Sequence, residues 1–303
     1  MFFPAPAGGH ELSSSLTAGM QPEDALHTVR VPGPDLLIHG PDMGRQGPPP
    51  GKTARGKRAR ASRYGFHPGA VRRPPACSTD YYTHVVYLGP NPLAPAKRRE
   101  IRVVMERTNA VLDRDAQASG GGGADLKVLC NESGTMRVTE LTSDARTFDE
   151  VATAVRTSWF MNPQADYAVF VDRTDPSACG YGSLYSDDRP GPENLNNAYG
   201  GVAVIYRDCW TNDTAMHEIG HMQGAVQPSS PSATGSGHCG EEQDVMCYQD
   251  GGPLNQQLRF DCDWNVRYDC GFDDYFDARP EPNEYLATHW NLASPSNYYI
   301  KLR

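Results

Sequence analysis

The chain lacks any apolar run long enough to cross a bilayer, and it lacks a recognisable leader. No segment of its 303 residues approaches the roughly 18 apolar residues that indicate a membrane-spanning helix. The first residues, MFFPAPAGGHELSSSL, contain no positively charged region followed by an apolar stretch of about 7–15 residues. The sequence therefore predicts no transmembrane segment, and any export must be inferred from other features.

No Cys-x-x-Cys pair occurs among the eight cysteines, which argues against a zinc module made of cysteines. An even number of cysteines favours disulfides, and disulfides indicate an oxidising compartment, so we expect a secreted protein. Eight free thiols in a cytosolic protein are the alternative. Pairing in chain order is the simplest connectivity: Cys77 with Cys130, Cys179 with Cys209, Cys239 with Cys247, and Cys262 with Cys270.

Acidic residues are missing from residues 51–76, which contain eight Lys or Arg, although the whole chain has a net charge of −9. Residues 1–76 are rich in Pro, Gly and Ser and show no apolar periodicity. We expect them to be disordered, as a propeptide or a linker, and residues 77–303 to form the folded domain. A basic tail can meet nucleic acid, but no known binding fold follows it, so we expect no nucleic-acid partner.

The folded part alternates between strand-like and helix-like patterns. Strands are predicted at 81–88, 126–130, 136–141, 167–171 and 199–206, with a short edge strand at 180–186. Amphipathic helices are predicted at 95–116 and from 147 to 159, with a final short helix at 284–292. This order predicts an α+β domain, in which helices pack on a twisted mixed sheet.

The stretch from His217 to Gln227, HEIGHMQGAVQ, constrains the chemistry most. On a helix, His217 and His221 lie four residues apart and therefore share one face, as two ligands of a zinc ion require. Glu218 lies roughly 100° round the helix from His217, beside the metal. It is placed to take a proton from a metal-bound water. An ordinary amphipathic helix with two core histidines is the alternative.

HExxHxxG followed by Asp244-Val-Met-Cys-Tyr248 resembles the metzincin clan of zinc endopeptidases, with reprolysin-like and astacin-like features. The resemblance implies a metzincin-like catalytic domain stabilised by disulfides. It also implies that Met246 forms an apolar floor under the metal and that Tyr248 reaches the zinc or the oxyanion. Gly224, followed by Pro228, predicts the end of the metal helix from the residues alone. It implies a protein or peptide substrate. A buried Met and Tyr are otherwise ordinary core residues.

The chain departs from the metzincin pattern at the third ligand, where Gln227 replaces the last His or Asp of HExxHxxGxxH. A neutral glutamine oxygen is a poor zinc ligand beside imidazole. The substitute that ligand chemistry favours is His238, which lies on a Gly-rich loop before the methionine turn. A disulfide between Cys239 and Cys247 would hold His238 close to that turn. Gln227 stays the alternative.

Aspartates crowd the segment after the methionine turn, at positions 261, 263, 269, 273, 274 and 277. A Ca²⁺ site is one interpretation, but no DxDxDG spacing appears, and the better interpretation is a set of surface acids. Nothing in the sequence indicates an oligomeric state.

Three functions fit these features. The first is a secreted zinc endopeptidase in which Glu218 is the general base. The second is a metzincin-like binding module that has lost hydrolysis, for which Gln227 is the warning sign. The third is a zinc hydrolase that acts on something other than peptides.

Overall fold

The computed structural model describes residues 71–198, 200–241, 244–248, 250–254, 259 and 267–303, together with the backbone of two short strands. Those two strands are β1 (His27–Val29) and β2 (Leu36–Ile38). They fall within the segment predicted to be disordered, and the rest of that segment up to residue 70 lies outside the described residues. The predicted boundary at residue 77 stays a prediction.

Three parallel strands form the centre of a ten-stranded sheet with the order β1-β2-β8-β9-β7-β4-β5-β10. The central strands are β4 (Tyr82–Gly89), β7 (Ala165–Val171) and β9 (Val202–Tyr206). The others are β3 (Ala76–Cys77), β5 (Ala124–Val128), β6 (Val138–Thr142), β8 (Gly180–Leu184) and β10 (Ile300–Leu302). Since β8 runs antiparallel to β9 while β7 runs parallel to it, the predicted mixed sheet is confirmed.

The central strands are apolar along nearly their whole length because both of their faces are covered. Alternate side chains enter two separate cores. The core shared with α1 and α4 contains Val85, Tyr87, Ala168, Phe170, Ala203 and Ile205. The core shared with α2 contains Val86, Leu88, Val169, Val171, Val202 and Val204.

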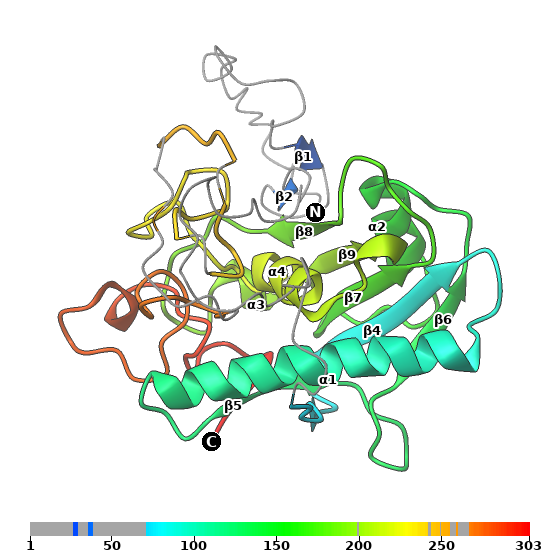
Figure 1. The fold of residues 1–303 in the computed structure, drawn as a ribbon, viewed down its shortest axis with the longest axis horizontal. Helices are drawn as coiled ribbons and strands as arrows, with labels where there is room; N and C mark the ends of the chain where they lie inside the picture. The colour runs from blue at the N-terminus through cyan, green and yellow to red at the C-terminus, as the bar shows by residue number, and fades with distance from the viewer. Residues whose placement is uncertain are drawn as a thin grey trace, which may run out of the picture.

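Helices cover the sheet as the patterns predict (Figure 1). They are α1 (Pro95–Ala118), α2 (Phe148–Arg156), α3 (Leu195–Ala198) and α4 (Asn212–Met222), with 3₁₀ turns at η1 (Arg207–Cys209) and η2 (Tyr285–Ala287). Thr147 and Glu150 form the capping box that begins α2. None of the described helices is long and apolar enough to span a membrane.

The prediction of a helix at 284–292 was wrong, since only the single turn of η2 forms there. The Thr288 N–H bonds to Tyr285 O, and the Trp290 N–H leaves the local chain to bond to Asp188 O. The second bond is to a carbonyl about a hundred residues away in the sequence. Tertiary contacts therefore override the weak local preference for a helix.

Three predicted disulfides are confirmed, namely Cys77–Cys130, Cys179–Cys209 and Cys239–Cys247. Cys270 is also disulfide-bonded, while its predicted partner Cys262 lies outside the described residues. The first bridge ties β3 to the end of β5. The second joins the approach to β8 with the turn that follows β9, so it fixes the entry to α4.

Candidate metal centre

Helix α4 begins and ends at residues whose side chains or conformations favour those ends. The Thr211 hydroxyl accepts a hydrogen bond from the Thr214 N–H and caps the start. At the other end Gly224 has φ +87°, its N–H bonds to His221 O, and the Ala225 N–H bonds to Gly220 O. This pair of bonds is a Schellman motif, which needs the left-handed conformation that glycine adopts freely.

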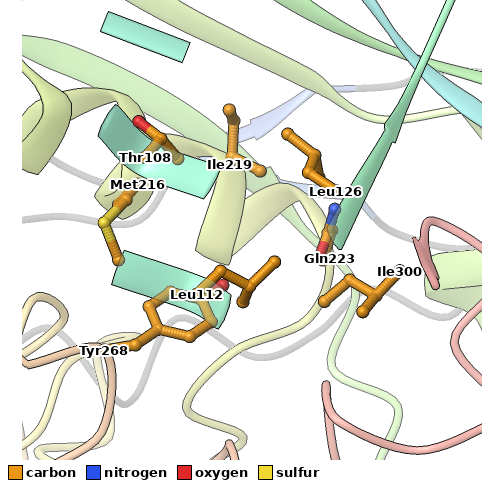
Figure 2. A pocket seen from close by; sticks show the side chains of 8 residues that line it. All are labelled: Thr108, Leu112, Leu126, Met216, Ile219, Gln223, Tyr268 and Ile300. Atoms are coloured by element: carbon orange, nitrogen blue, oxygen red, sulfur yellow. The ribbon is translucent and has the colours of Figure 1, made fainter. Parts of the chain in front are cut away.

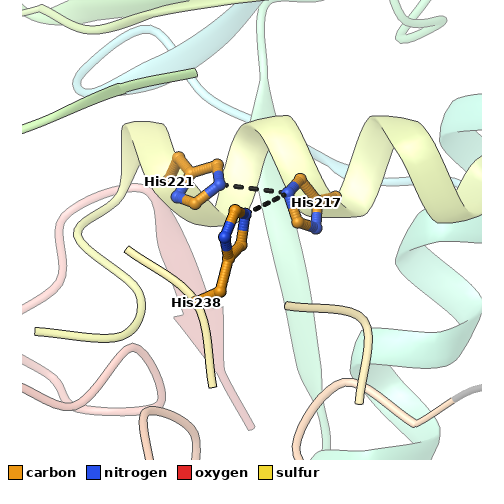
Figure 3. A group of neighbouring side chains, drawn as sticks. All are labelled: His217, His221 and His238. Carbon is orange, nitrogen blue, oxygen red and sulfur yellow. Dashed lines mark hydrogen bonds between the residues drawn. The ribbon is translucent and has the colours of Figure 1, made fainter. Parts of the chain in front are cut away.

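Three histidines meet at one point beside α4 (Figure 3). His217 and His221 project from the helix, and His238 comes from the loop before the methionine turn. The Nε2 atom of His217 lies 3.0 Å from that of His221 and 3.3 Å from that of His238. All three side chains are almost completely buried. The structure thus brings together the two predicted helix ligands and His238.

Two of these rings are oriented by hydrogen bonds from their outer nitrogens. The His217 Nδ1–H donates to Val245 O at 2.7 Å, and the His238 Nδ1–H donates to a carboxylate oxygen of Asp250 at 2.7 Å. Because Nδ1 carries the proton in each neutral ring, Nε2 presents a lone pair to the shared point. Burial and the neighbouring His217 lower the pKa of His238 well below its usual value, which keeps the ring neutral.

The arrangement fits a zinc ion. Tetrahedral zinc with Zn–N distances of about 2.0–2.1 Å requires neighbouring ligand nitrogens about 3.3 Å apart. The observed Nε2 separations from His217 are 3.0 and 3.3 Å. The Nε2 lone pairs of His217 and His238 face each other at 3.3 Å and repel, so a cation between them would remove an unfavourable contact.

Glu218 is completely buried at the junction between α4 and β8. A Cβ atom built on Gly180 would lie 2.6 Å from Glu218 Oε1, and one on Gly182 would lie 2.5 Å from His221 Cβ. Larger residues at these two positions of β8 would push the helix away. The glycines therefore let the strand approach the side of the helix that carries the histidine and the glutamate.

The methionine turn lies directly against the histidines. A Cβ atom on Gly220, between His217 and His221, would be 2.6 Å from Met246 Sδ, so this thioether packs on the helix backbone. The ring of Tyr248 has its centroid 3.9 Å from that of His238 and 5.8 Å from that of His217. Both residues are buried, and their expected roles beside a metal stay predictions.

Gln227 is held by contacts with the backbone. Its Nε2 donates to Tyr185 O at 3.2 Å and to Gly224 O at 2.9 Å, and its side chain is buried. These bonds link the end of the metal helix to the segment after β8.

Sequence reasoning missed Asp250. Its Oδ2 accepts from His238 Nδ1 and from Thr234 Oγ1 at 2.7 Å each, and its Oδ1 accepts from the Gly252 N–H at 2.8 Å. A carboxylate that holds a ligating histidine is a common support of metal sites. The only signal in the sequence was an acidic residue shortly after the methionine turn.

A small cavity opens between α1, α4, β5 and β10 (Figure 2). It is lined by Thr108, Leu112, Leu126, Met216, Ile219, Gln223, Tyr268 and Ile300. Its volume of about 10 Å³ corresponds to at most one water molecule. It contains none of the metal-centre histidines and is a packing defect of the core.

The sequence of residues 98–226 matches the model of the metallo-peptidase family M12B, reprolysin-like. The match confirms the resemblance to the metzincin peptidases and includes His217, Glu218, His221 and Gly224. It stops one residue before Gln227, so His238 and the methionine turn lie beyond it. Peptidases of this family use zinc. No curated protein matches the chain.

Among solved structures the chain is similar to OgpA from Akkermansia muciniphila, with 13% identity, 51% of each chain covered and a TM-score of 0.31. The chain therefore spans about half the length of that structure. A catalytically inactive OgpA in complex with an O-glycopeptide substrate has 12% identity, with 70% of this chain and 67% of that chain covered and a TM-score of 0.31. For metalloproteinase-II from Bacteroides fragilis, the identity is 16%, the coverage 65% and 55%, and the TM-score 0.29.

Proposed function

We propose, on the premise that residues 98–226 match the reprolysin-like M12B metallo-peptidases, that this chain is a secreted zinc endopeptidase. The observation that carries the proposal is the convergence of the Nε2 atoms of His217, His221 and His238 beside the buried Glu218. The three disulfides support an oxidising, extracellular location.

His217, His221 and His238 would hold the zinc. When bound, zinc supplies a Lewis acid that lowers the pKa of a water and polarises the scissile carbonyl. Glu218 would act as the general base for the attacking water and as the general acid for the departing amine. Tyr248, packed on His238, is the candidate donor to the oxyanion. Asp250 keeps His238 in the tautomer that presents Nε2.

The edge of β8 is the candidate position for an extended peptide. In this structure β2 pairs with that edge in antiparallel register, Leu37 opposite Leu184 and Ile38 opposite Ser183. The edge therefore accepts a strand, and β8 itself packs on the side of α4 that carries Glu218 and His221. A substrate bound there by main-chain hydrogen bonds would pass beside the metal centre.

The test is hydrolysis of casein by oxidatively folded protein, measured with its zinc content. The proposal expects about one zinc per chain, loss of cleavage when a chelator removes it, and recovery when zinc is restored. A protein that holds zinc but cleaves only small esters would favour a non-peptide hydrolase. A protein that cleaves neither would favour a binding module.

A further inference from the structure

Gln227 stands where the metzincin pattern has its third metal ligand, yet its side chain makes contacts of another kind. The side chain is almost completely buried. Its Nε2 has two protons, and it donates to two carbonyl oxygens, Gly224 O at 2.9 Å and Tyr185 O at 3.2 Å. A histidine or an aspartate has no –NH₂ group and cannot make both of these bonds. The departure from the pattern therefore gives the chain a connection that the usual ligand could not supply.

The two carbonyl groups belong to the two elements on either side of the candidate peptide position. Gly224 lies in the turn that ends α4, the helix that carries His217 and His221. Tyr185 directly follows β8, whose last residue, Leu184, pairs with β2. The Gln227 amide thus ties the end of the metal helix to the end of the strand edge that accepts another strand.

Asn196 holds the same backbone groups from a second direction. Its Oδ1 accepts from the Tyr185 N–H at 3.1 Å, and its Nδ2 donates to Tyr185 O at 3.2 Å. One side-chain amide therefore provides both bonds that a residue of a neighbouring antiparallel strand would exchange. Asn196 also lies against the turn after α4, since a Cβ atom built on Gly224 would be 2.5 Å from its Nδ2.

The loop that carries Asn196 is braced by its own polar side chains. Asn194 Nδ2 donates to Asp187 O at 2.7 Å and to Arg189 O at 2.9 Å. Asp187 Oδ2 accepts from the Leu195 N–H at 2.7 Å. A loop with this many internal bonds keeps its shape, so a contact with α4 at one end sets the position of the whole loop.

We propose that Gln227 is a positioning residue for the substrate. It holds the end of β8 at a fixed place relative to α4, so that a peptide paired with β8 lies beside the metal centre. The inference rests on the proposed function in taking the β8 edge as the peptide position. Because small displacements of a bound substrate from the reacting groups are costly, a glutamine at this place serves peptide binding without ligating the metal.

The fold should survive the loss of this side chain. Tyr185 O also accepts from the Asp187 N–H at 2.9 Å and from Asn196, so it keeps partners when the Gln227 amide is removed. Gln227→Ala therefore leaves no unsatisfied carbonyl at Tyr185 and should loosen the link between β8 and α4.

The test measures peptide binding by the anisotropy of fluorescein-labelled casein. The parent protein is zinc-loaded and carries Glu218→Gln, which keeps the casein intact. We expect Gln227→Ala to raise the Kd for casein about 3–10-fold and to leave the zinc content unchanged. The matched control is Gln223→Ala, which removes an equally buried glutamine of the same turn that lines the small cavity instead. This control should leave the Kd for casein unchanged.

Gln227→Glu separates positioning from metal ligation. A carboxylate is a better zinc ligand than an amide, but it lacks the two N–H donors. We expect this variant to bind casein as weakly as Gln227→Ala does. Tighter zinc binding with an unchanged Kd for casein would overturn the inference, as would loss of zinc in Gln227→Ala. An equal rise in Kd for Gln223→Ala would also overturn it, by showing a general loosening of the turn.

Failure of this inference and failure of the peptidase proposal give different results. A wild type that cleaves nothing, while the zinc-loaded parent binds casein, refutes the peptidase and leaves the inference to the Kd values of the variants. Cleavage by wild type with an unchanged Kd in Gln227→Ala keeps the peptidase and overturns the inference. A parent that binds no casein overturns the inference whether or not the wild type cleaves.

Discussion

The three histidines of the candidate metal centre and the carboxylates of Asp244, Asp269 and Asp274 are all buried, but their charges respond to burial in opposite ways. The prediction of surface acids was therefore wrong for Asp269 and Asp274, and also for Asp277. Each described bond to an outer histidine nitrogen fixes a proton there and leaves a neutral lone pair at the centre. The carboxylates instead lie close to one another: burial raises the pKa of Asp274, and burial together with neighbouring carboxylates raises the pKa values of Asp244 and Asp269. A buried imidazole avoids the cost of burying a charge by staying neutral, whereas a buried carboxylate needs a proton or a cation close by.

The largest effect is expected at Glu218. Replacing it with Gln keeps the shape of the buried side chain but removes the base, so kcat/KM for casein should fall about 10²–10⁴-fold. Zinc content should not change, since none of the three Nε2 ligands is altered. Activity assays with metal analysis of the same preparation check this, and an active Glu218→Gln protein would show that the base is another residue.

The hydrogen bond between Asp250 and His238 indicates that the three histidines form a supported metal site and not a chance group. Asp250→Ala removes the acceptor for His238 Nδ1–H, so the ring loses its fixed orientation and tautomer. Zinc affinity should fall about 10–100-fold, as measured by competition with a chromogenic chelator. The matched control is Asp149→Ala on the surface of α2, and equal affinities for the two variants would contradict a supporting role for Asp250.

The free energy of unfolding should depend on pH in opposite directions for the buried carboxylates and for the buried His84. The pKa of Asp274 is raised by burial, so its stabilising effect is present at acidic pH and is lost as pH rises through the folded-state pKa. Asp274→Asn should therefore be less destabilising, relative to wild type, at pH 8 than at pH 5. Urea unfolding of both proteins at the two pH values measures the difference, and an equal cost of the substitution at pH 5 and pH 8 would contradict it.

The contribution of His84 to stability changes with pH in the opposite direction. Burial lowers its pKa to about 4, and the ring bonds to Thr139 Oγ1 at 2.7 Å. Because the unfolded chain binds the proton first, stability should rise with pH between about 4 and 6.5, by up to about 3 kcal/mol. His84→Gln should flatten this part of the pH profile of urea unfolding, and an unchanged slope would assign it to other groups.

The smallest effect concerns β2 at the edge of β8. Leu37→Pro removes a backbone N–H from the strand that pairs opposite Leu184. If β2 competes with substrate for this edge, KM for an extended peptide should fall a few-fold while kcat stays constant. Steady-state kinetics of wild type and variant test this, and an unchanged KM would mean that substrate binds elsewhere.

The placement of the candidate ligands on α4 was predictable because these residues are close together in the sequence. His217, Glu218 and His221 lie within five residues, and a helix fixes their relation. His238 could be inferred from ligand chemistry and from the neighbouring disulfide. Asp250 and the partners of Asp274 could not, since their contacts depend on the path of an irregular loop. The pairing of β2 with β8 was equally hidden, because a three-residue apolar run has no periodicity to recognise.

The most direct test of the three-histidine centre is the zinc content of His238→Ala compared with Gln227→Ala, each folded oxidatively and dialysed against the same chelator. We expect Gln227→Ala to keep about one zinc per chain and His238→Ala to lose it. Retention of zinc by His238→Ala with loss in Gln227→Ala would contradict the account and make the glutamine the third ligand.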